Sequence, residues 1–263
     1  MNTKPQPFDD YAAGYDGHFT HSNIGRLQRR QAWDVFASLK LYNQNILEIN
    51  CGTGEDAAHL SAEGNTVTGT DASAEMIKQA SQKNPSIKFE QATFLQLKEK
   101  LGNSKFDLIF SNFGGLNCVP VDELKKLSSD FAGLLNDRGK LFVVVMGRKC
   151  KWEQIYFLLK GEREEAFRRK QNIGIKTTIN GNTFNTYYYS PKEFITLFAP
   201  DFEIELVRPI GLFIPPSYLE PFFKKHTLTL KALNWLDKIF GGFGFIANHA
   251  DHFVLVMTKK SNP

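Results

Sequence analysis

The chain has 263 residues, of which 42% are hydrophobic and 23% charged, and this is enough apolar material for a sizeable buried core. No apolar run is long enough to cross a membrane, which excludes a membrane-spanning protein. The net charge of +4 comes without a basic run, so we expect no nucleic-acid partner. The three cysteines lack paired spacing, so we expect no metal site and a cytoplasmic protein with reduced thiols.

The N-terminal residues 1–45 are expected to form a helical segment that covers the ligand site of the core. Met1–Asp10 is polar and shows no signal peptide. Apolar side chains recur at helical spacing from Ile24 to Phe36, which predicts a helix that covers one face of a sheet. Arg26, Arg29 and Arg30 lie on this helix, and Arg168-Arg169-Lys170 form a second basic cluster later in the chain. We interpret both clusters as solvated helix faces.

Residues 46–150 have the pattern of a nucleotide-binding core. Ile46–Ile49 is predicted to be a buried strand, and Gly52 and Gly54 allow the backbone to turn tightly beside a ligand. After a short helix, Asn65–Thr70 forms a second strand that ends at Asp71. A carboxylate at this end of a parallel strand can accept two hydrogen bonds from a ribose diol. We therefore expect the site to bind an adenosine-containing molecule.

Strands and helices continue to alternate to the end of the chain. Five further strands are predicted at Ile87–Glu90, Phe106–Phe110, Leu141–Met146, Phe202–Arg208 and Asp251–Thr258. Helices are predicted to begin at Ser73, near Pro120 and near Ser190, the second ending at Asn136–Gly139. This alternation predicts an α/β fold with a doubly wound, seven-stranded, mostly parallel sheet.

Two additions interrupt the core. In residues 151–190, a helix over Trp152–Arg169 precedes a hairpin with an Asn180-Gly181 turn, which we interpret as a lid. Residues 191–263 complete the sheet but contain an insertion at about 212–248. Within it, Ser217-x-x-Glu220 predicts a capping box, and Gly241–Phe245 is an aromatic, glycine-rich loop. The insertion fits either a lid over an acceptor pocket or a homodimer contact.

Two motifs carry a family resemblance. Glu48 to Gly54 read E-x-N-x-G-x-G, and Phe8 to Asp16 read F-D-x-x-A-x-x-Y-D. Together they resemble the class I S-adenosylmethionine-dependent methyltransferases of small molecules, similar to those of quinone and biotin pathways. The chain departs from the family at Asn50, where a glycine is usual, and at Ala92-Thr93, where a Gly-Asp pair is usual. A nicotinamide-dependent oxidoreductase fits less well, because the glycine spacing differs and Glu48 would repel a pyrophosphate.

The resemblance implies a Rossmann-like methyltransferase fold that transfers a methyl group from S-adenosyl-L-methionine to an O, N or C atom of a small acceptor, leaving S-adenosyl-L-homocysteine. The aromatic insertion suits a bulky or flat acceptor. The cofactor residues that it implies are Tyr15, Glu48, Asn50, Cys51, Gly52, Gly54, Asp71, Ala72, Met76, Thr93, Phe94 and Ser111. The acceptor residues are Asn112, Phe113, Tyr187 and Tyr189. Simple packing remains the alternative for Tyr15, Met76 and the tyrosines.

An acceptor hydroxyl would need a general base, for which His18, His21, His249 and His252 are the candidates. We expect no metal at His249 and His252, because the two side chains fall on opposite faces of a strand entry. A non-catalytic protein that binds S-adenosylmethionine, and a methyltransferase of protein or RNA, remain alternatives.

Overall fold

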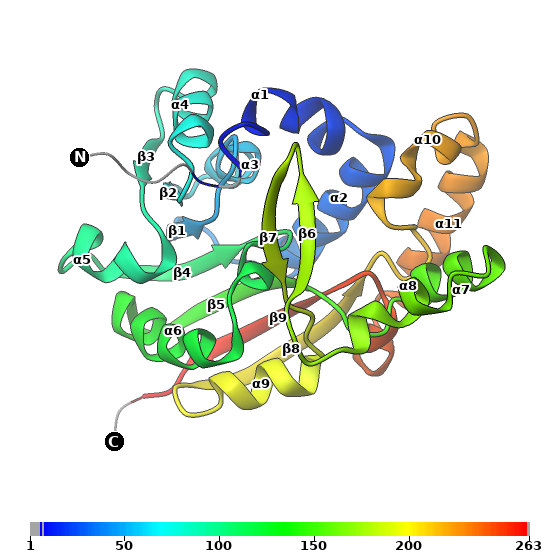
Figure 1. Cartoon of the computed structure of the whole chain (residues 1–263). Helices are drawn as coiled ribbons and strands as arrows, with labels where there is room; N and C mark the ends of the chain where they lie inside the picture. The colour runs from blue at the N-terminus through cyan, green and yellow to red at the C-terminus, as the bar shows by residue number, and fades with distance from the viewer. Residues whose placement is uncertain (1–5, 7, 262–263) are drawn as a thin grey trace.

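The computed structural model describes residue 6 and residues 8–261, and its centre is a sheet of seven strands (Figure 1). The strands are β1 (Asn45–Ile49), β2 (Thr66–Asp71), β3 (Lys88–Gln91), β4 (Phe106–Ser111), β5 (Leu135–Met146), β8 (Phe202–Ile210) and β9 (His252–Lys259). Their order is β3-β2-β1-β4-β5-β9-β8, and only β9 runs antiparallel to its neighbours. The predicted seven-stranded, mostly parallel sheet is confirmed. Most of the N-terminal stretch in which we expected no signal peptide lies outside the described residues.

Helices cover both faces of the sheet. They are α1 (Ala12–Tyr15), α2 (Asn23–Ser38), α3 (Glu55–Ala62), α4 (Ala74–Lys83), α5 (Leu97–Leu101), α6 (Val121–Leu134), α7 (Lys151–Leu159), α8 (Arg163–Phe167), α9 (Pro191–Phe198), α10 (Glu220–Phe223) and α11 (Thr227–Phe240). Buried side chains of α2 and α3 pack against one face, and those of α5, α6 and α9 against the other. No helix of the described residues is long and apolar enough to cross a membrane.

Local sequence explains where the core helices begin. The Ser73 hydroxyl accepts a hydrogen bond from the Met76 N–H at 3.2 Å, and Ser190 forms a capping box with Glu193 at the start of α9. Such caps satisfy N–H groups that have no partner within the helix and contribute about 1 kcal/mol each. On α6, Leu124, Leu127 and Phe131 are fully buried, as their spacing predicts.

Two parts of the chain differ from the predicted boundaries by more than two residues. α6 ends at Leu134 and β5 begins at once at Leu135, because Leu135 pairs with Phe106 on β4. The register then shifts, and Arg138 takes a φ of +60° before Lys140 pairs with Leu108. The expected helix over residues 152–169 is divided into α7 and α8, because the backbone turns at Gly161 with a φ of +77°.

The predicted hairpin is present as β6 (Ile175–Ile179) and β7 (Asn182–Thr186). Asn180 and Gly181 both have positive φ, at 48° and 83°, which is the conformation that a two-residue hairpin turn needs. The hairpin stands apart from the main sheet and reaches towards α1 (Figure 1). There Asn182 Nδ2 donates to Asp10 Oδ2 at 2.9 Å.

The insertion between β8 and β9 packs against the start of α2. Ile24 of α2 shares a buried cluster with Leu219, Phe223 and Leu230 of the insertion. The predicted capping box at Ser217 is wrong, since its side chain caps no helix. Instead, the Glu220 carboxylate accepts from the backbone N–H groups of Asn23 and Ile24, each at 2.9 Å. The glutamate thus caps α2, a helix nearly two hundred residues away in the sequence.

Candidate functional site

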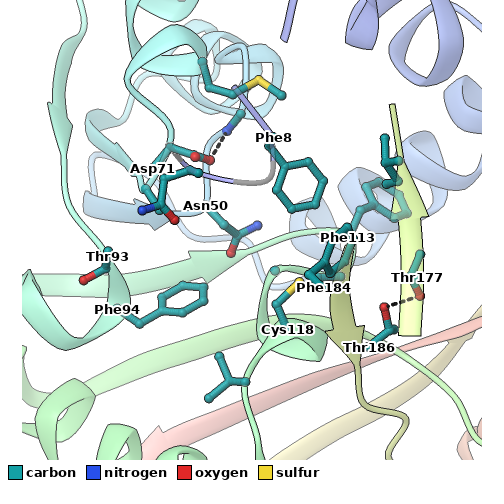
Figure 2. Close-up of a pocket in the computed structure, with 18 of the residues that line it drawn as sticks. Phe8, Asn50, Asp71, Thr93, Phe94, Phe113, Cys118, Thr177, Phe184 and Thr186 are labelled. Carbon is teal, nitrogen blue, oxygen red and sulfur yellow. Dashed lines mark hydrogen bonds between the residues drawn. The ribbon is translucent and has the colours of Figure 1, made fainter. Parts of the chain in front are cut away.

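A cavity of about 640 Å³ lies at the carboxyl ends of the central strands, where the strand order reverses between β1 and β4. The N-terminal segment and the β6–β7 hairpin complete its wall. Figure 2 shows two sides of this cavity, which we call the loop half and the hairpin half. The loop half is lined by Tyr15, Asn50, Gly52, Asp71, Ala72, Met76, Ala92, Thr93, Phe94 and Leu95. The hairpin half is lined by Phe8, Phe113, Thr177, Ile179, Phe184, Thr186 and Tyr188.

The loop after β1 forms the floor of the loop half. Gly52 has a φ of +52°, and a Cβ atom there would have only the Tyr15 ring within 4 Å, at 3.8 Å. Gly54 also has positive φ, but its Cβ would lie about 3 Å from Phe89 and Ala80, which shows that it serves the packing of the loop rather than the cavity wall. One glycine therefore opens space for a ligand, and the other permits close packing.

Asn50 replaces the usual glycine and has a φ of +68°. Its side chain joins the loop after β1 to the loop after β4. Ser111 Oγ donates to Asn50 Oδ1 and Asn50 Nδ2 donates to Asn112 O, both at 2.7 Å. The asparagine tolerates the turn and also connects two loops that border the cavity.

We expect Asn50→Gly to lower the free energy of unfolding by about 1 kcal/mol, because the loss of two hydrogen bonds outweighs the relief of backbone strain. Urea unfolding would measure the change. Asn180→Gly is the matched control, since Asn180 also has positive φ but its side chain makes only an exposed contact of 3.4 Å. Equal losses in both variants would contradict the assigned role of the Asn50 side chain.

Asp71 ends β2 at the wall of the cavity. Its two carboxylate oxygens accept from the N–H groups of Gly52 and Ser73, each at 2.9 Å. A carboxylate has about four acceptor positions, so these two donors leave room for a ligand. Burial raises the pKa of Asp71, although these two backbone donors oppose the shift.

The two aspartates of the N-terminal motif hold that segment against the loops. Asp9 Oδ1 accepts from Ser73 Oγ at 2.6 Å, beside Asp71. Asp16 accepts from Thr53 Oγ1 at 2.6 Å and pairs with Lys83 at 2.7 Å. Tyr15 is thereby held over Gly52, and burial raises the pKa of its phenol to about 12, so it remains protonated at neutral pH.

The hairpin half is mostly aromatic and apolar. The rings of Phe8 and Phe184 lie 5.1 Å apart, and they join the N-terminal segment to the hairpin. The hydroxyls of Thr177 and Thr186 lie 2.8 Å apart and bond to each other (Figure 2). Within the described part of the chain, the wall carries no cationic side chain, and its charged groups are Asp71 and Glu123.

Several residues predicted to bind the cofactor do not line the cavity. Glu48 is buried behind the loop, where burial and the nearby Asp56 raise its pKa well above the usual range. Cys51 is also buried, and burial raises the pKa of its thiol, which agrees with a space-filling role. Ser111 lies behind Asn50, as described above. Sequence spacing located the loop correctly but not the direction of each side chain.

The three consecutive tyrosines at 187–189 have the opposite orientation to the prediction, which placed Tyr187 and Tyr189 at the acceptor. Tyr188 lines the cavity, whereas Tyr189 is buried in the core and its hydroxyl donates to Val119 O at 2.6 Å. Tyr187 packs against the same core, and its N–H donates to Asn117 O at 2.7 Å. Asn117 also donates to the carbonyl groups of Tyr187 and Met146. These bonds hold the backbone so that the Tyr188 side chain faces the cavity and its two neighbours face the core.

Asn112 does not reach the cavity, although Phe113 does. The Asn112 amide donates to Asp56 at 3.2 Å, and Asp56 is also paired with the buried Arg29. Arg29 Cζ lies 5.4 Å from the centre of the Phe113 ring. The prediction of a solvated arginine cluster is therefore wrong for Arg29, because Asp56 compensates its buried charge and the pair supports Phe113 from behind.

None of the four histidines predicted as bases, His21 included, lines the cavity. His18 is exposed, with Nδ1 2.7 Å from Gly14 O. His249 lies at the end of a short helical turn, and burial with the charges of Lys151 and Lys149 lowers its pKa. His252 is buried beside Asp251 and meets the edge of the Phe113 ring at 5.3 Å between centroids.

Two other observations limit the chemistry of the wall. Cys118 lines the cavity, but burial raises the pKa of its thiol to about 11, so it stays protonated at neutral pH. Across residue 6 and residues 8–261, no cluster of three histidine, cysteine or acidic side chains could hold a metal ion. Among the described residues, the wall thus offers binding and orientation, and its only charged side chains are the carboxylates of Asp71 and Glu123.

Comparison with known proteins agrees with this arrangement. Residues 46–139 match the family model described as a methyltransferase domain. A putative methyltransferase of Geobacillus sp. (strain WCH70) is 33% identical over 121 residues, which cover 42% of this chain and 48% of that protein. An uncharacterized methyltransferase of Synechocystis is 30% identical over 112 residues, which cover 41% of this chain and 50% of that protein. The chain spans about half the length of these curated relatives.

Solved structures share the fold over most of the chain. A SAM-dependent methyltransferase of Methanosarcina mazei has a TM-score of 0.60 at 19% identity, covering 87% of this chain and 98% of that one. A protein of Pyrococcus horikoshii has a TM-score of 0.61 at 14% identity, with coverage of 96% and 100%. Magnesium protoporphyrin IX methyltransferase of Synechocystis, solved with bound SAH, has a TM-score of 0.53 at 15% identity, with coverage of 90% and 83%.

Proposed function

Since residues 46–139 of this chain form a methyltransferase domain of the class I S-adenosylmethionine-dependent family, we propose that the protein transfers a methyl group from S-adenosylmethionine to an uncharged, largely apolar small molecule. The observation that carries the proposal is the placement of Asp71 beside Gly52 and beneath Tyr15, at the point where the strand order reverses. One cavity thus contains a carboxylate, an open backbone turn and an aromatic ring that covers the turn.

The residues of the loop half fit each part of this cofactor. Asp71 retains acceptor positions for the two ribose hydroxyls. Met76, Ala92 and Phe94 supply apolar walls for a flat adenine ring. The open space above Gly52 leaves room for the methionine part. Thr93 can offer adenine an acceptor only, because its hydroxyl and N–H both donate to Gln96.

The charge of the wall also suits this cofactor. When bound, S-adenosylmethionine supplies a methyl group on a positively charged sulfur, which activates that methyl for transfer. Asp71 and Glu123 are both acidic, and the Tyr15 and Phe113 rings can face a cation with their π electrons. A wall with these groups favours a cationic ligand over an anionic one.

The protein's part in the reaction is to hold the acceptor atom in line with the bond between the methyl group and the sulfur, and to exclude water. The Phe8–Phe184 contact and the Asn182–Asp10 bond close the hairpin over the N-terminal segment. Phe113 and Tyr188 then offer flat apolar surfaces to the acceptor. Fixing two reactants in this way supplies much of the rate enhancement for a transfer that needs no covalent intermediate.

The hairpin half favours an amine or a carbon nucleophile as acceptor. A neutral amine reacts through its lone pair and an electron-rich carbon through its π electrons, and each loses its proton to water after the methyl group has been transferred. An alcohol would need a base during the transfer step. The uncharged Thr177, Thr186 and Tyr188 offer hydrogen bonds, and none of the described residues of the wall is a cation that could hold a carboxylate or phosphate. Asp71 is assigned to the ribose, so Glu123 is the carboxylate of the wall that could pair with an amine acceptor.

Calorimetric titration with S-adenosylmethionine, S-adenosylhomocysteine and NADH tests the cofactor. The sample must first be shown by denaturation and chromatography to carry no adenosyl ligand. We expect micromolar binding of the two adenosyl ligands and none of NADH. Acceptors would then be screened by homocysteine-product release, with apolar amines compared to carboxylates of the same ring. Failure of a ligand-free, folded sample to bind either adenosyl ligand would contradict the proposal, whereas binding without any transfer would favour a non-catalytic role.

We expect histidine replacement to leave transfer to the best amine acceptor nearly unchanged. His18→Ala and His249→Ala should alter kcat by less than about threefold, against the 10²–10⁴-fold that a general base contributes. The pH profile of both variants should follow the pKa of the acceptor amine, as in the unmodified protein. A loss above a hundredfold, with a shifted basic limb, would identify the replaced histidine as a base.

A further inference from the structure

α11 has apolar side chains on two opposite sides. Leu230 and Leu233 pack into the buried cluster that the insertion shares with α2. On the other side, Leu228, Trp235 and Ile239 are 79%, 62% and 47% exposed. Their spacing of seven and four residues places them on one line along the helix. A helix that is apolar on both sides is expected to be covered on both, and here one side faces solvent.

The exposed apolar surface continues beyond the end of the helix. Phe240 contacts Phe243, and Phe243 contacts Phe245, with ring centroids 6.3 and 5.8 Å apart. All three rings are exposed. We call Leu228, Trp235, Ile239, Phe243 and Phe245 the α11 surface. A contiguous apolar surface with a polar border marks an interaction site.

The exposed charges of the segment 221–250 are all positive. They belong to Lys224 and Lys225, which precede α11, and to Lys231 and Lys238 on α11. The segment 221–250 contains one acid, Asp237, and its side chain is buried. Asp237 is engaged inside the molecule, where it accepts from the N–H groups of Leu212, Phe213 and Ile214 at 2.8 to 3.1 Å. The segment therefore presents four ammonium groups and no exposed carboxylate beside the α11 surface.

We propose that the α11 surface docks on a membrane surface that carries anionic lipids. Leucine, isoleucine, phenylalanine and tryptophan side chains enter the boundary between headgroups and acyl chains, while lysines meet the anionic headgroups. In Figure 1 the insertion forms one end of the molecule together with α7, whose Leu158 and Leu159 are also exposed. The docking would hold the protein at the interface without spanning the bilayer.

A second copy of the chain fits this surface less well. A two-fold dimer brings the same patch of both subunits together, so Lys231 and Lys238 would face the lysines of the partner. The exposed part of the segment has no acid to pair with them. Like charges at an interface disfavour association, whereas an anionic lipid surface complements them.

The test mixes the full chain with sedimentable vesicles of phosphatidylcholine alone, and of phosphatidylcholine with about one third phosphatidylglycerol. We expect the protein to partition onto the anionic vesicles and its tryptophan emission to shift to shorter wavelength. Trp235 is the reporter, because the indole N–H groups of Trp33 and Trp152 are bonded inside the molecule to Asp56 and Phe213.

Variants separate the two contributions. Leu228→Ser with Ile239→Ser should weaken partition by about tenfold or more, because buried CH₂ groups drive insertion. Lys231→Glu with Lys238→Glu should weaken binding to anionic vesicles by about tenfold or more and leave any weak binding to neutral vesicles unchanged. Tyr42→Ser is the control, since Tyr42 is 68% exposed outside the α11 surface. Circular dichroism would verify that each variant is folded.

The proposal is overturned if the folded protein does not bind anionic vesicles. It is also overturned if the double variant Leu228→Ser with Ile239→Ser binds them as well as the unmodified chain does. Self-association that depends on concentration and is abolished by Trp235→Ser, without vesicle binding, would assign the surface to a second copy instead. Retained vesicle binding by Tyr42→Ser, together with loss in both pairs, supports the membrane assignment.

Discussion

Asp71→Ala is expected to weaken the binding of S-adenosylmethionine by about thirtyfold to a few hundredfold. The carboxylate would accept two hydrogen bonds from the ribose, and a hydrogen bond to a charged group contributes about 1.5 kcal/mol or more. Its position is well defined, because Gly52 and Ser73 each donate to it at 2.9 Å. Calorimetric titration of both adenosyl ligands would measure the change.

Two further variants make this result specific. Asp71→Asn keeps the shape and one acceptor, so we expect an intermediate loss. Glu90→Ala removes a carboxylate from the neighbouring strand β3, outside the cavity wall, and should leave the affinity unchanged. An affinity of Asp71→Ala within about threefold of the unmodified protein would contradict the ribose role.

The same carboxylate predicts how cofactor affinity depends on pH. Burial raises the pKa of Asp71, so the group gains a proton at a higher pH than an exposed aspartate does. Only the charged form accepts both ribose hydroxyls. Affinity should therefore be constant at neutral pH and fall as the pH drops through the raised pKa, and Asp71→Asn should remove this dependence. An unchanged dependence in Asp71→Asn would assign it to another group.

Arg169→Leu is expected to lower the free energy of unfolding by about 3–5 kcal/mol, because two buried acids lose the buried counter-charge that they share, although Arg168 still pairs with one and His252 with the other. Arg169 is buried and pairs with Glu153 at 2.7 Å and with Asp251 at 2.8 Å. Its guanidinium also lies 5.0 Å from the centre of the Tyr188 ring. Loss of the arginine should therefore disturb the cavity wall as well as the fold.

Urea unfolding at several pH values would measure this effect. Lys170→Leu is the matched control, since Lys170 is the exposed neighbour and should change stability by less than about 0.5 kcal/mol. Burial alone would raise the pKa of Asp251, but His252 and Arg169 lower it below the usual range. The stabilisation that the Arg169–Asp251 pair contributes is thus fully present above the pKa of an ordinary aspartate. It is lost as the pH falls through the lowered pKa of Asp251. A loss below 1 kcal/mol in Arg169→Leu would contradict the assigned role.

The buried arginines show where sequence reasoning failed. Arg29 and Arg169 each lie in a basic cluster, and clusters of that kind usually face solvent. Burial became possible because Asp56 supplies the counter-charge for Arg29, while Glu153 and Asp251 supply it for Arg169. Asp56 and Asp251 are distant from their partners in sequence, so no local pattern could reveal these pairs. The Glu220 cap on α2 was missed for the same reason.

The acceptor side of the cavity was predicted only in part. The Asn180-Gly181 turn located the hairpin, because two positive φ angles need those residue types. Alternation along the following tyrosines was also expected, but its phase depends on the bonds from Asn117 to Tyr187 and Met146. Those bonds turn Tyr188 to the cavity and the other two rings to the core.

The sequence by itself determined the alternating strands and helices, the glycine turn after the first strand and the acid that ends the second. Each of these depends on neighbours within a few residues, through backbone conformation, capping and the period of apolar side chains. Only the tertiary structure decided which side chains reach the cavity, which charges are buried and which side of α11 is left uncovered. Those outcomes depend on contacts between distant segments, and the free energy of such contacts leaves no periodic pattern in the chain.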